Sequence, residues 1–128
     1  MTFPHASPAL DRALVARNYD EPTPVQAAVL EDQARGRDLL VSAQTGSGKT
    51  VAYGLALGTS MLAQGDAMGP AGRPRALVIA PTRELALQVE REFAWLWEET
   101  GARVVPCVGG MDPRAERRKL EAGAHIVV

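Results

Sequence analysis

Eight consecutive residues have the composition of a phosphate-binding loop, and they read Ala43-Gln44-Thr45-Gly46-Ser47-Gly48-Lys49-Thr50. A polyphosphate needs many hydrogen-bond donors in a small concave space, and the N–H groups at a helix N-terminus supply them with the positive end of the helix dipole. Gly46 and Gly48 let the backbone come close to the phosphates. Lys49 is then placed to reach the β and γ phosphates, and the Thr50 hydroxyl to bind magnesium. The alternative is a glycine-rich turn with a solvated lysine.

The elements around this loop are those that a phosphate site needs. An apolar run at 39–41 precedes the loop, and similar runs at 76–80, 104–105 and 126–128 predict four short strands buried on both faces. Apolar residues at helical spacing follow the loop. A second predicted helix ends at a C-cap, Gly101, and has an apolar stripe of four residues: Leu85, Val89, Phe93 and Leu96. Strand and helix alternate, which predicts an α/β fold with an incomplete parallel sheet, helices on both faces, and ligand sites at the carboxyl ends of the strands.

Two helices are expected before the loop. Ser7-Pro8 and Thr23-Pro24 each place a capping residue before proline at the first helical position, and the second helix is predicted to run to Gly36. The glycine- and proline-rich segment 64–74 is predicted to be a surface loop.

Composition limits the class of protein. The chain has 128 residues, enough for one domain, with 14 basic and 15 acidic residues, so any nucleic-acid contact must be local. The single cysteine excludes an internal disulfide, and no apolar run is long enough to cross a membrane, which predicts a soluble, cytoplasmic protein.

His5 and His125 lack partners at metal-ligand spacing, which argues against zinc. Trp95 and Trp97 are expected to divide between surface and core, and Cys107 to be a small buried hydrophobe.

The apolar run 126–128 reaches the last residue with no turn or cap after it. We therefore expect a truncated domain of marginal stability that self-associates through exposed, unpaired sheet edges.

Phe3 and the run Tyr19-Asp20-Glu21-Pro22-Thr23-Pro24-Val25-Gln26 resemble the adenine-recognising Q motif of the DEAD-box RNA helicases. The resemblance implies that Gln26 reads the adenine edge, that Phe3 packs near the base, and that Tyr19 and Thr23 belong to the same site. An amide suits adenine because it offers a donor and an acceptor together. Thr23-x-x-Gln26 is also a capping box, so both residues have a purely structural interpretation, and the two roles are compatible.

Two further motifs resemble RNA-contacting elements of that family. Pro81-Thr82-Arg83-Glu84 is similar to motif Ia, and Gly109-Gly110 to the GG element. Their structural alternatives are an ordinary helix cap, with Glu84 balancing the dipole, and a plain turn. A basic cluster is interpreted as a solvated helix face and not as a site: Arg114, Arg117, Arg118 and Lys119.

The resemblance implies the first RecA-like domain of an ATP-dependent RNA helicase, with 1–36 as the Q-motif helical region and 37–128 as the phosphate loop and α/β core. ATP, magnesium and single-stranded RNA are the implied ligands. The Asp-Glu-Ala-Asp segment that the family needs for hydrolysis does not occur in residues 1–128. The chain is therefore expected to bind nucleotide through Lys49 and Thr50 without turnover. The alternatives are another P-loop enzyme, such as a small-molecule kinase, and a non-catalytic nucleotide-binding module.

Overall fold

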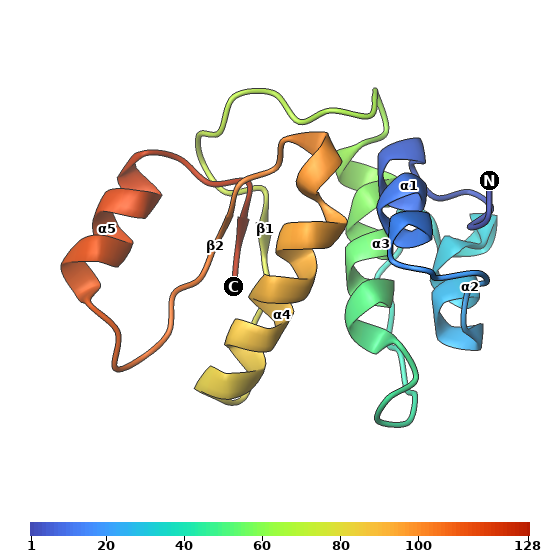
Figure 1. The fold of residues 1–128 in the computed structure, drawn as a ribbon, viewed down its shortest axis with the longest axis horizontal. Coiled ribbons are helices and arrows are strands. Elements are labelled where there is room, and N and C mark those ends of the chain that lie inside the picture. Colours follow the sequence, from blue (N-terminus) through green and yellow to red (C-terminus); the bar gives the residue numbers. More distant parts are fainter. The chain divides into compact units, whose positions relative to one another are not determined.

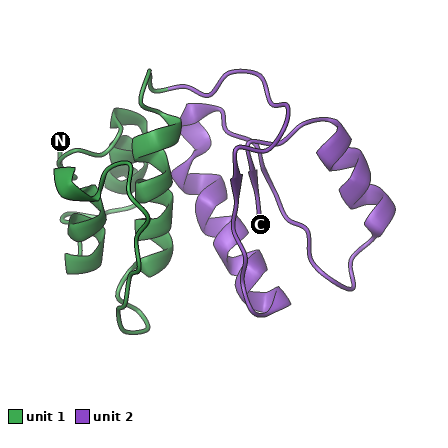
Figure 2. Ribbon diagram, turned by 180° about the vertical axis from the view of Figure 1, so that it is seen from behind, with its two compact units in different colours: residues 1–66 green, residues 67–128 purple.

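Three helices form the first of two units in the computed structural model, which describes all residues from 1 to 128 (Figure 1). This unit comprises residues 1–66 and is green in Figure 2. Its helices are α1 (Pro8–Ala16), α2 (Pro24–Leu30) and α3 (Lys49–Met61), with a 3₁₀ turn η1 (Asp32–Ala34) after α2. Both N-terminal helices begin at the proline that the sequence predicted. The second helix is shorter than predicted, because it ends at Leu30 and the 3₁₀ turn fills part of the way to Gly36.

Two contacts hold α1 in the first unit. Gly58 on α3 lets Leu10 come close, since a Cβ at position 58 would stand 2.5 Å from Leu10 Cδ1. The N-terminus of α1 is capped by Asp66 and not by Ser7 itself. The Asp66 carboxylate accepts hydrogen bonds from the Ser7 hydroxyl and from the Ala9 N–H at 2.8 Å. A carboxylate at a helix N-terminus also interacts favourably with the helix dipole.

The strand expected at 39–41 is not formed, so this prediction is wrong. The segment has no strand partner, and the Leu40 side chain is fully exposed. A β-strand needs a neighbouring strand to take up its backbone N–H and C=O groups, and the first unit contains no other strand. The apolar composition of 39–41 therefore does not lead to burial here.

The second unit, residues 67–128, contains the sheet. Its strands are β1 (Ala76–Leu77), β2 (Val104–Val105) and β3 (Ile126–Val127), and its helices are α4 (Arg83–Leu96) and α5 (Pro113–Glu121), with a 3₁₀ turn η2 (Glu98–Thr100) after α4. The strands are parallel in the order β1-β3-β2, so β3 is central. Strands are thus confirmed at three of the four predicted positions, although each is only two residues long.

The predicted stripe on α4 buries Val89, Phe93 and Leu96, whereas Leu85 remains 37% exposed. The chain leaves η2 at Gly101 in the left-handed conformation, with φ +73°. Trp97 is fully buried and Trp95 is only partly buried, which confirms the expected division. Cys107 is half-buried against Val105, Ala124 and Val127, so it is less buried than predicted.

His125 connects the long loop 64–74 to the sheet. Its Nδ1 accepts a hydrogen bond from the Arg103 N–H at 2.8 Å, so the neutral ring carries its proton on Nε2. Nε2 then donates to the Gly69 carbonyl oxygen at 2.7 Å. With both ring nitrogens satisfied and only 4% of the residue exposed, His125 is a buried structural residue.

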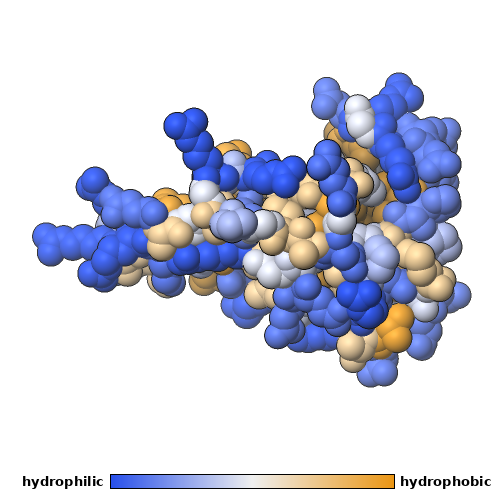
Figure 3. Space-filling view, turned by 90° about the horizontal axis from the view of Figure 1, so that it is seen from above, coloured by the Kyte–Doolittle hydropathy of each residue, from blue (hydrophilic) through white to orange (hydrophobic).

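Hydrophilic side chains cover most of the surface visible in Figure 3, with smaller hydrophobic patches between them. None of the helices has both the length and the apolar character needed to cross a bilayer.

Candidate functional site

The phosphate loop joins the extended segment 39–42 to the first residue of α3. Gly46 and Gly48 adopt φ +80° and +88°, the left-handed region that glycine tolerates best. The turn is closed by the Ser47 N–H, which donates to the Gln44 carbonyl oxygen at 3.1 Å. Because α3 starts at Lys49, the N–H groups of its first turn have no partner within the helix. These groups can donate to an anion.

The polar side chains of the loop fit a phosphate. Lys49 Nζ donates to the Ala43 carbonyl oxygen at 2.6 Å, which joins the two ends of the loop. A lysine ammonium has three N–H donors, so two remain for a phosphate. The Ser47 hydroxyl is buried and has no hydrogen-bond partner, and the half-buried Thr50 follows Lys49 in the first turn of α3. An unpartnered hydroxyl and free helix N–H groups are the donors that an anion and its magnesium ion would use.

Gln26 connects α2 to this loop. Its Oε1 accepts from the Thr23 N–H at 3.0 Å, so this half of the capping box is formed. Its Nε2 donates to the Gly48 carbonyl oxygen at 3.3 Å, a contact that sequence reasoning missed. An amide has two lone pairs and two N–H groups, so one acceptor and one donor position remain. Gln26 is fully buried, so a base reaches this remaining donor and acceptor only when the neighbouring side chains move aside.

The two aromatic residues assigned to the same site have their own contacts in the first unit. Phe3 is fully buried, and its N–H donates to Asp11 Oδ1 at 2.7 Å. Tyr19 is half-buried just beyond α1, and its N–H donates to the Leu14 carbonyl oxygen at 3.1 Å. The structure thus gives both residues a place in the fold, and their contact with a base stays a prediction.

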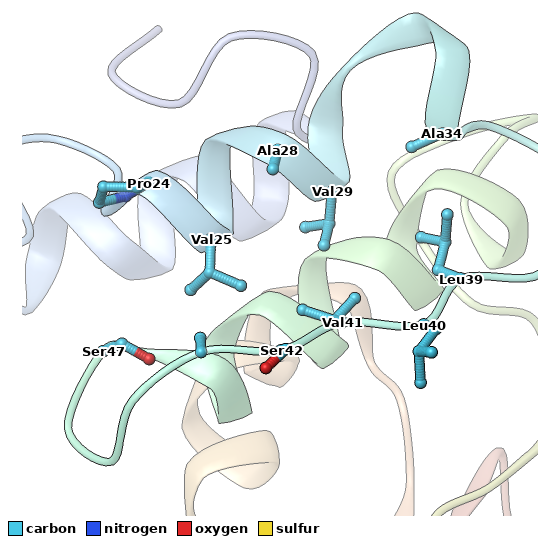
Figure 4. Close-up of a pocket in the computed structure, with 11 residues that line it drawn as sticks. Pro24, Val25, Ala28, Val29, Ala34, Leu39, Leu40, Val41, Ser42 and Ser47 are labelled. Atoms are coloured by element: carbon cyan, nitrogen blue, oxygen red, sulfur yellow. The ribbon is translucent and has the colours of Figure 1, made fainter.

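An apolar pocket of about 510 Å³ lies beside the loop. In Figure 4, Val25 and Val29 of α2 point toward Val41 on the extended segment, whereas Leu40 points away. Ala43 and Ser47 of the loop also contribute to the lining. Sequence reasoning missed this pocket, although the apolar spacing of Val25, Ala28 and Val29 was its signal.

In the second unit the two predicted RNA-contacting motifs come together. Pro81, Thr82 and Arg83 follow β1, and Gly109 follows β2, so both lie beyond the carboxyl ends of parallel strands. They line one polar pocket of about 320 Å³ with Cys107 and Val108. Thr82 is the N-cap of α4, since its Oγ1 accepts from the Leu85 N–H at 3.2 Å. Thr82 therefore does cap α4, as its structural interpretation predicted, and it also lines the pocket.

The remaining charged candidates lie on exposed helix surfaces. Glu84 stands in the first turn of α4, where it complements the helix dipole. The α5 helix buries no residue, and its Arg117 pairs with Glu121 at 2.9 Å. The interpretation of the basic cluster as a solvated face agrees with this exposure.

A glycine-rich loop that opens a helix and a parallel sheet with polar loops beyond its strands define a P-loop α/β protein. The sequence pattern of the DEAD/DEAH box helicases matches residues 23–128. The chain therefore belongs to the DEAD/DEAH box helicase family.

Individual relatives agree with this assignment. The chain is 44% identical over 125 residues to DEAD-box ATP-dependent RNA helicase 52A of Oryza sativa subsp. japonica, covering 89% of this chain and 21% of the relative. The structure of the yeast DEAD-box splicing factor Prp28 matches 98% of this chain and 31% of its own, with a TM-score of 0.82 and 28% identity. Prp28 from Chaetomium thermophilum, bound to ADP, matches 94% of this chain and 29% of its own, with a TM-score of 0.79 and 38% identity. The chain thus spans less than a third of these proteins, and the shared architecture is RecA-like.

Proposed function

We propose that this chain is the ATP-binding and RNA-contacting part of an ATP-dependent RNA helicase. The observation that carries the proposal is the bond from Gln26 to Gly48, which links a potential base-reading amide to the phosphate loop. The rice relative is named an ATP-dependent RNA helicase, and a Prp28 structure contains ADP, which supports nucleotide as the ligand.

The loop residues divide the work of holding a magnesium triphosphate. Backbone N–H groups of the loop and the first turn of α3 cradle the phosphates, and Lys49 supplies positive charge. The Thr50 hydroxyl would hold magnesium, which neutralises charge on the phosphate oxygens when bound. Gln26 uses its remaining donor and acceptor for adenine, and its two structural bonds fix the plane of the amide. Because one side chain contacts both α2 and the loop, base identity and phosphate binding are coupled.

The polar pocket of the second unit is the proposed RNA contact. The first turn of α4 presents free N–H groups, and Arg83 adds positive charge at the pocket wall. Gly109 offers backbone without a side chain. These groups suit phosphates and not base edges, so the contact should be independent of RNA sequence.

Turnover is proposed to be absent from the polypeptide of residues 1–128. Phosphoryl transfer depends on groups that position the attacking water and stabilise developing charge, and this sequence has no Asp-Glu-Ala-Asp segment. Phosphate release with magnesium and RNA tests this point. A rate above that of the Lys49→Ala chain would contradict it, whereas binding without release agrees with a nucleotide-binding role.

The first experiment measures binding of fluorescent ATP and GTP analogues with magnesium to the 128-residue chain. We expect a preference for adenine, and Lys49→Ala should weaken binding of both analogues at least about tenfold through loss of a charged hydrogen bond. Lys119→Ala, on an exposed helix, is the matched control. Gln26→Glu keeps the acceptor and the size of the side chain but removes both donors, so it should lower the adenine preference.

Thermal melts must accompany Gln26→Glu because the site is buried. Equal affinities for the two analogues in the parent chain would overturn adenine recognition. No binding by a folded chain would overturn nucleotide binding itself.

A further inference from the structure

The two glycines of Gly109-Gly110 have different surroundings. Gly110 has φ +80°, and a Cβ there would stand 2.5 Å from Arg83 Nη1. The left-handed backbone therefore favours glycine at 110, and any larger residue would displace the Arg83 guanidinium. At Gly109 the backbone is outside the left-handed region, and a Cβ would meet nothing within 4 Å. Nothing within this chain explains the missing side chain at 109, which lines the polar pocket.

The residue before this pair is held by Glu116. Glu116 lies on α5, and its Oε1 accepts a hydrogen bond from the Val108 N–H at 3.0 Å. Glu116 is half-buried, whereas most of α5 is exposed. The loop that carries the glycines thus has Glu116 bonded at its base and the Arg83 guanidinium against Gly110.

The position of α5 itself depends on polar contacts, because the helix buries no side chain. At its C-terminal end, Arg103 donates to the Lys119 and Ala122 carbonyl oxygens, each at 3.4 Å. At its N-terminal half, the bond from Val108 to Glu116 joins it to the loop. Without this bond the loop 108–112 would lose its side-chain anchor to α5.

Cys107 offers a second experimental readout of the same carboxylate. Burial raises the pKa of the Cys107 thiol, and the negative charge of Glu116 raises it further. Glu116 is therefore close enough to Cys107 to affect its ionisation, which provides a chemical readout that does not require RNA.

We propose that Glu116 is a positioning residue for RNA contact, and that with Arg83 it holds the loop so that the bare backbone of Gly109 faces a phosphate of the RNA. The inference rests on the proposed RNA contact in the second unit. Gly110 serves the conformation of the loop, and Gly109 leaves room for the ligand. The carboxylate touches no RNA, since its role is to fix the Val108 N–H.

The test compares Glu116→Ala with Glu116→Gln in the full 128-residue chain. Glutamine keeps an oxygen that can accept from the Val108 N–H, whereas alanine removes it. Binding of a fluorescein-labelled single-stranded oligouridylate should weaken about fivefold in Glu116→Ala, on the scale of one hydrogen bond, and should be retained in Glu116→Gln. Glu121→Ala is the matched control because its carboxylate pairs with Arg117 on the same helix.

Two further readouts separate positioning from general stability. Exchange of the Val108 amide, measured by NMR, should accelerate in Glu116→Ala and stay slow in Glu116→Gln. Alkylation of Cys107 should be faster at neutral pH in both variants, because both remove the negative charge that raises the thiol pKa. Gly109→Ala should weaken RNA binding without lowering the melting temperature, and Gly110→Ala should lower the melting temperature.

Equal RNA binding by the parent chain and a folded Glu116→Ala would overturn the inference, as would an unchanged exchange rate at Val108. Loss of RNA binding in Glu116→Gln equal to that in alanine would overturn the role of the hydrogen bond. If the parent chain binds no RNA, the proposed RNA contact fails, and the Val108 exchange rates still decide whether Glu116 holds the loop.

Discussion

Gln26 Nε2 donates to the Gly48 carbonyl oxygen at 3.3 Å and thereby joins two residues that are 22 positions apart in the sequence. The same glycine has φ +88°, and a Cβ there would stand 2.3 Å from Gln26 Nε2. Two features therefore favour glycine at position 48: the left-handed backbone conformation and the close approach of the Gln26 amide.

Gly48→Ala should lower the free energy of unfolding by about 2–4 kcal/mol, because left-handed strain adds to displacement of a buried amide. Gly36→Ala is the control, since Gly36 has a similar φ of +66° but an open Cβ position. It should cost only about 1–2 kcal/mol from strain. Urea unfolding of both variants measures the difference. Equal losses would show that the contact between Gln26 and Gly48 contributes nothing.

Local patterns predicted the phosphate loop, because Gly46, Gly48 and the start of α3 at Lys49 depend on neighbouring residues. Half of the capping box at Thr23 and Gln26 was predictable for the same reason. The bond from Gln26 to Gly48 was not, because a contact between distant segments leaves no local signal. Asp66 as the cap of α1 is a similar case, since a Ser-Pro pair indicates where a helix starts and not which carboxylate reaches it.

The segment 39–41 shows where local reasoning fails for strands. An apolar run indicates that a segment suits a buried strand, but pairing depends on a partner elsewhere. Val104 and Ile126 pair across β2 and β3, whereas Leu40 has no strand partner and is fully exposed. The same distinction applies to the proposed RNA contact. Sequence motifs indicated Thr82 and Gly109, whereas only the structure showed that Glu116 bonds to the loop that carries Gly109.

His125→Ala should destabilise the second unit, because the ring accepts from the Arg103 N–H and donates to the Gly69 carbonyl oxygen. Loss of two partly buried hydrogen bonds and of the ring should lower the free energy of unfolding by about 2–4 kcal/mol. His5→Ala is the matched control, since the His5 side chain is 53% exposed and lies 3.8 Å from Asp32. It should change stability by less than about 0.5 kcal/mol. Thermal and urea unfolding measure both variants, and similar losses would contradict a structural role for His125.

Protonation of Asp66 should make the first unit less stable in acid. Burial raises the pKa of Asp66, but hydrogen bonds from Ser7 and the Ala9 N–H, together with Arg12, outweigh burial and hold the pKa below its ordinary value. Because the folded-state pKa is the lower one, the contribution to stability is complete above the unfolded-state pKa and is lost as the pH falls through the folded-state value.

Asp66→Asn should therefore be less stable than the parent chain at pH 7, and the difference should shrink below about pH 4. We expect a loss of at most about 1 kcal/mol, since 34% of the side chain is exposed. Urea unfolding from pH 7 to pH 3 measures it, with Asp20→Asn, at an exposed position, as the control. A difference that stays constant across this range would rule out ionisation as the cause.

If copies of the chain associate through the segment 39–41, as we expect, Leu40→Lys should reduce that association without changing stability. The side chain is fully exposed on an extended segment that has no strand partner, so copies of the chain can meet there through unpaired backbone and apolar side chains. A lysine on such a segment disfavours pairing by charge repulsion, and its effect on unfolding should stay within about 0.5 kcal/mol. Sedimentation velocity over a range of concentrations should show less association for Leu40→Lys than for the parent chain.

Val15→Lys, at a 48% exposed apolar position on α1, tests whether added charge alone has this effect. A parent chain that stays monomeric at every concentration would contradict association through this segment.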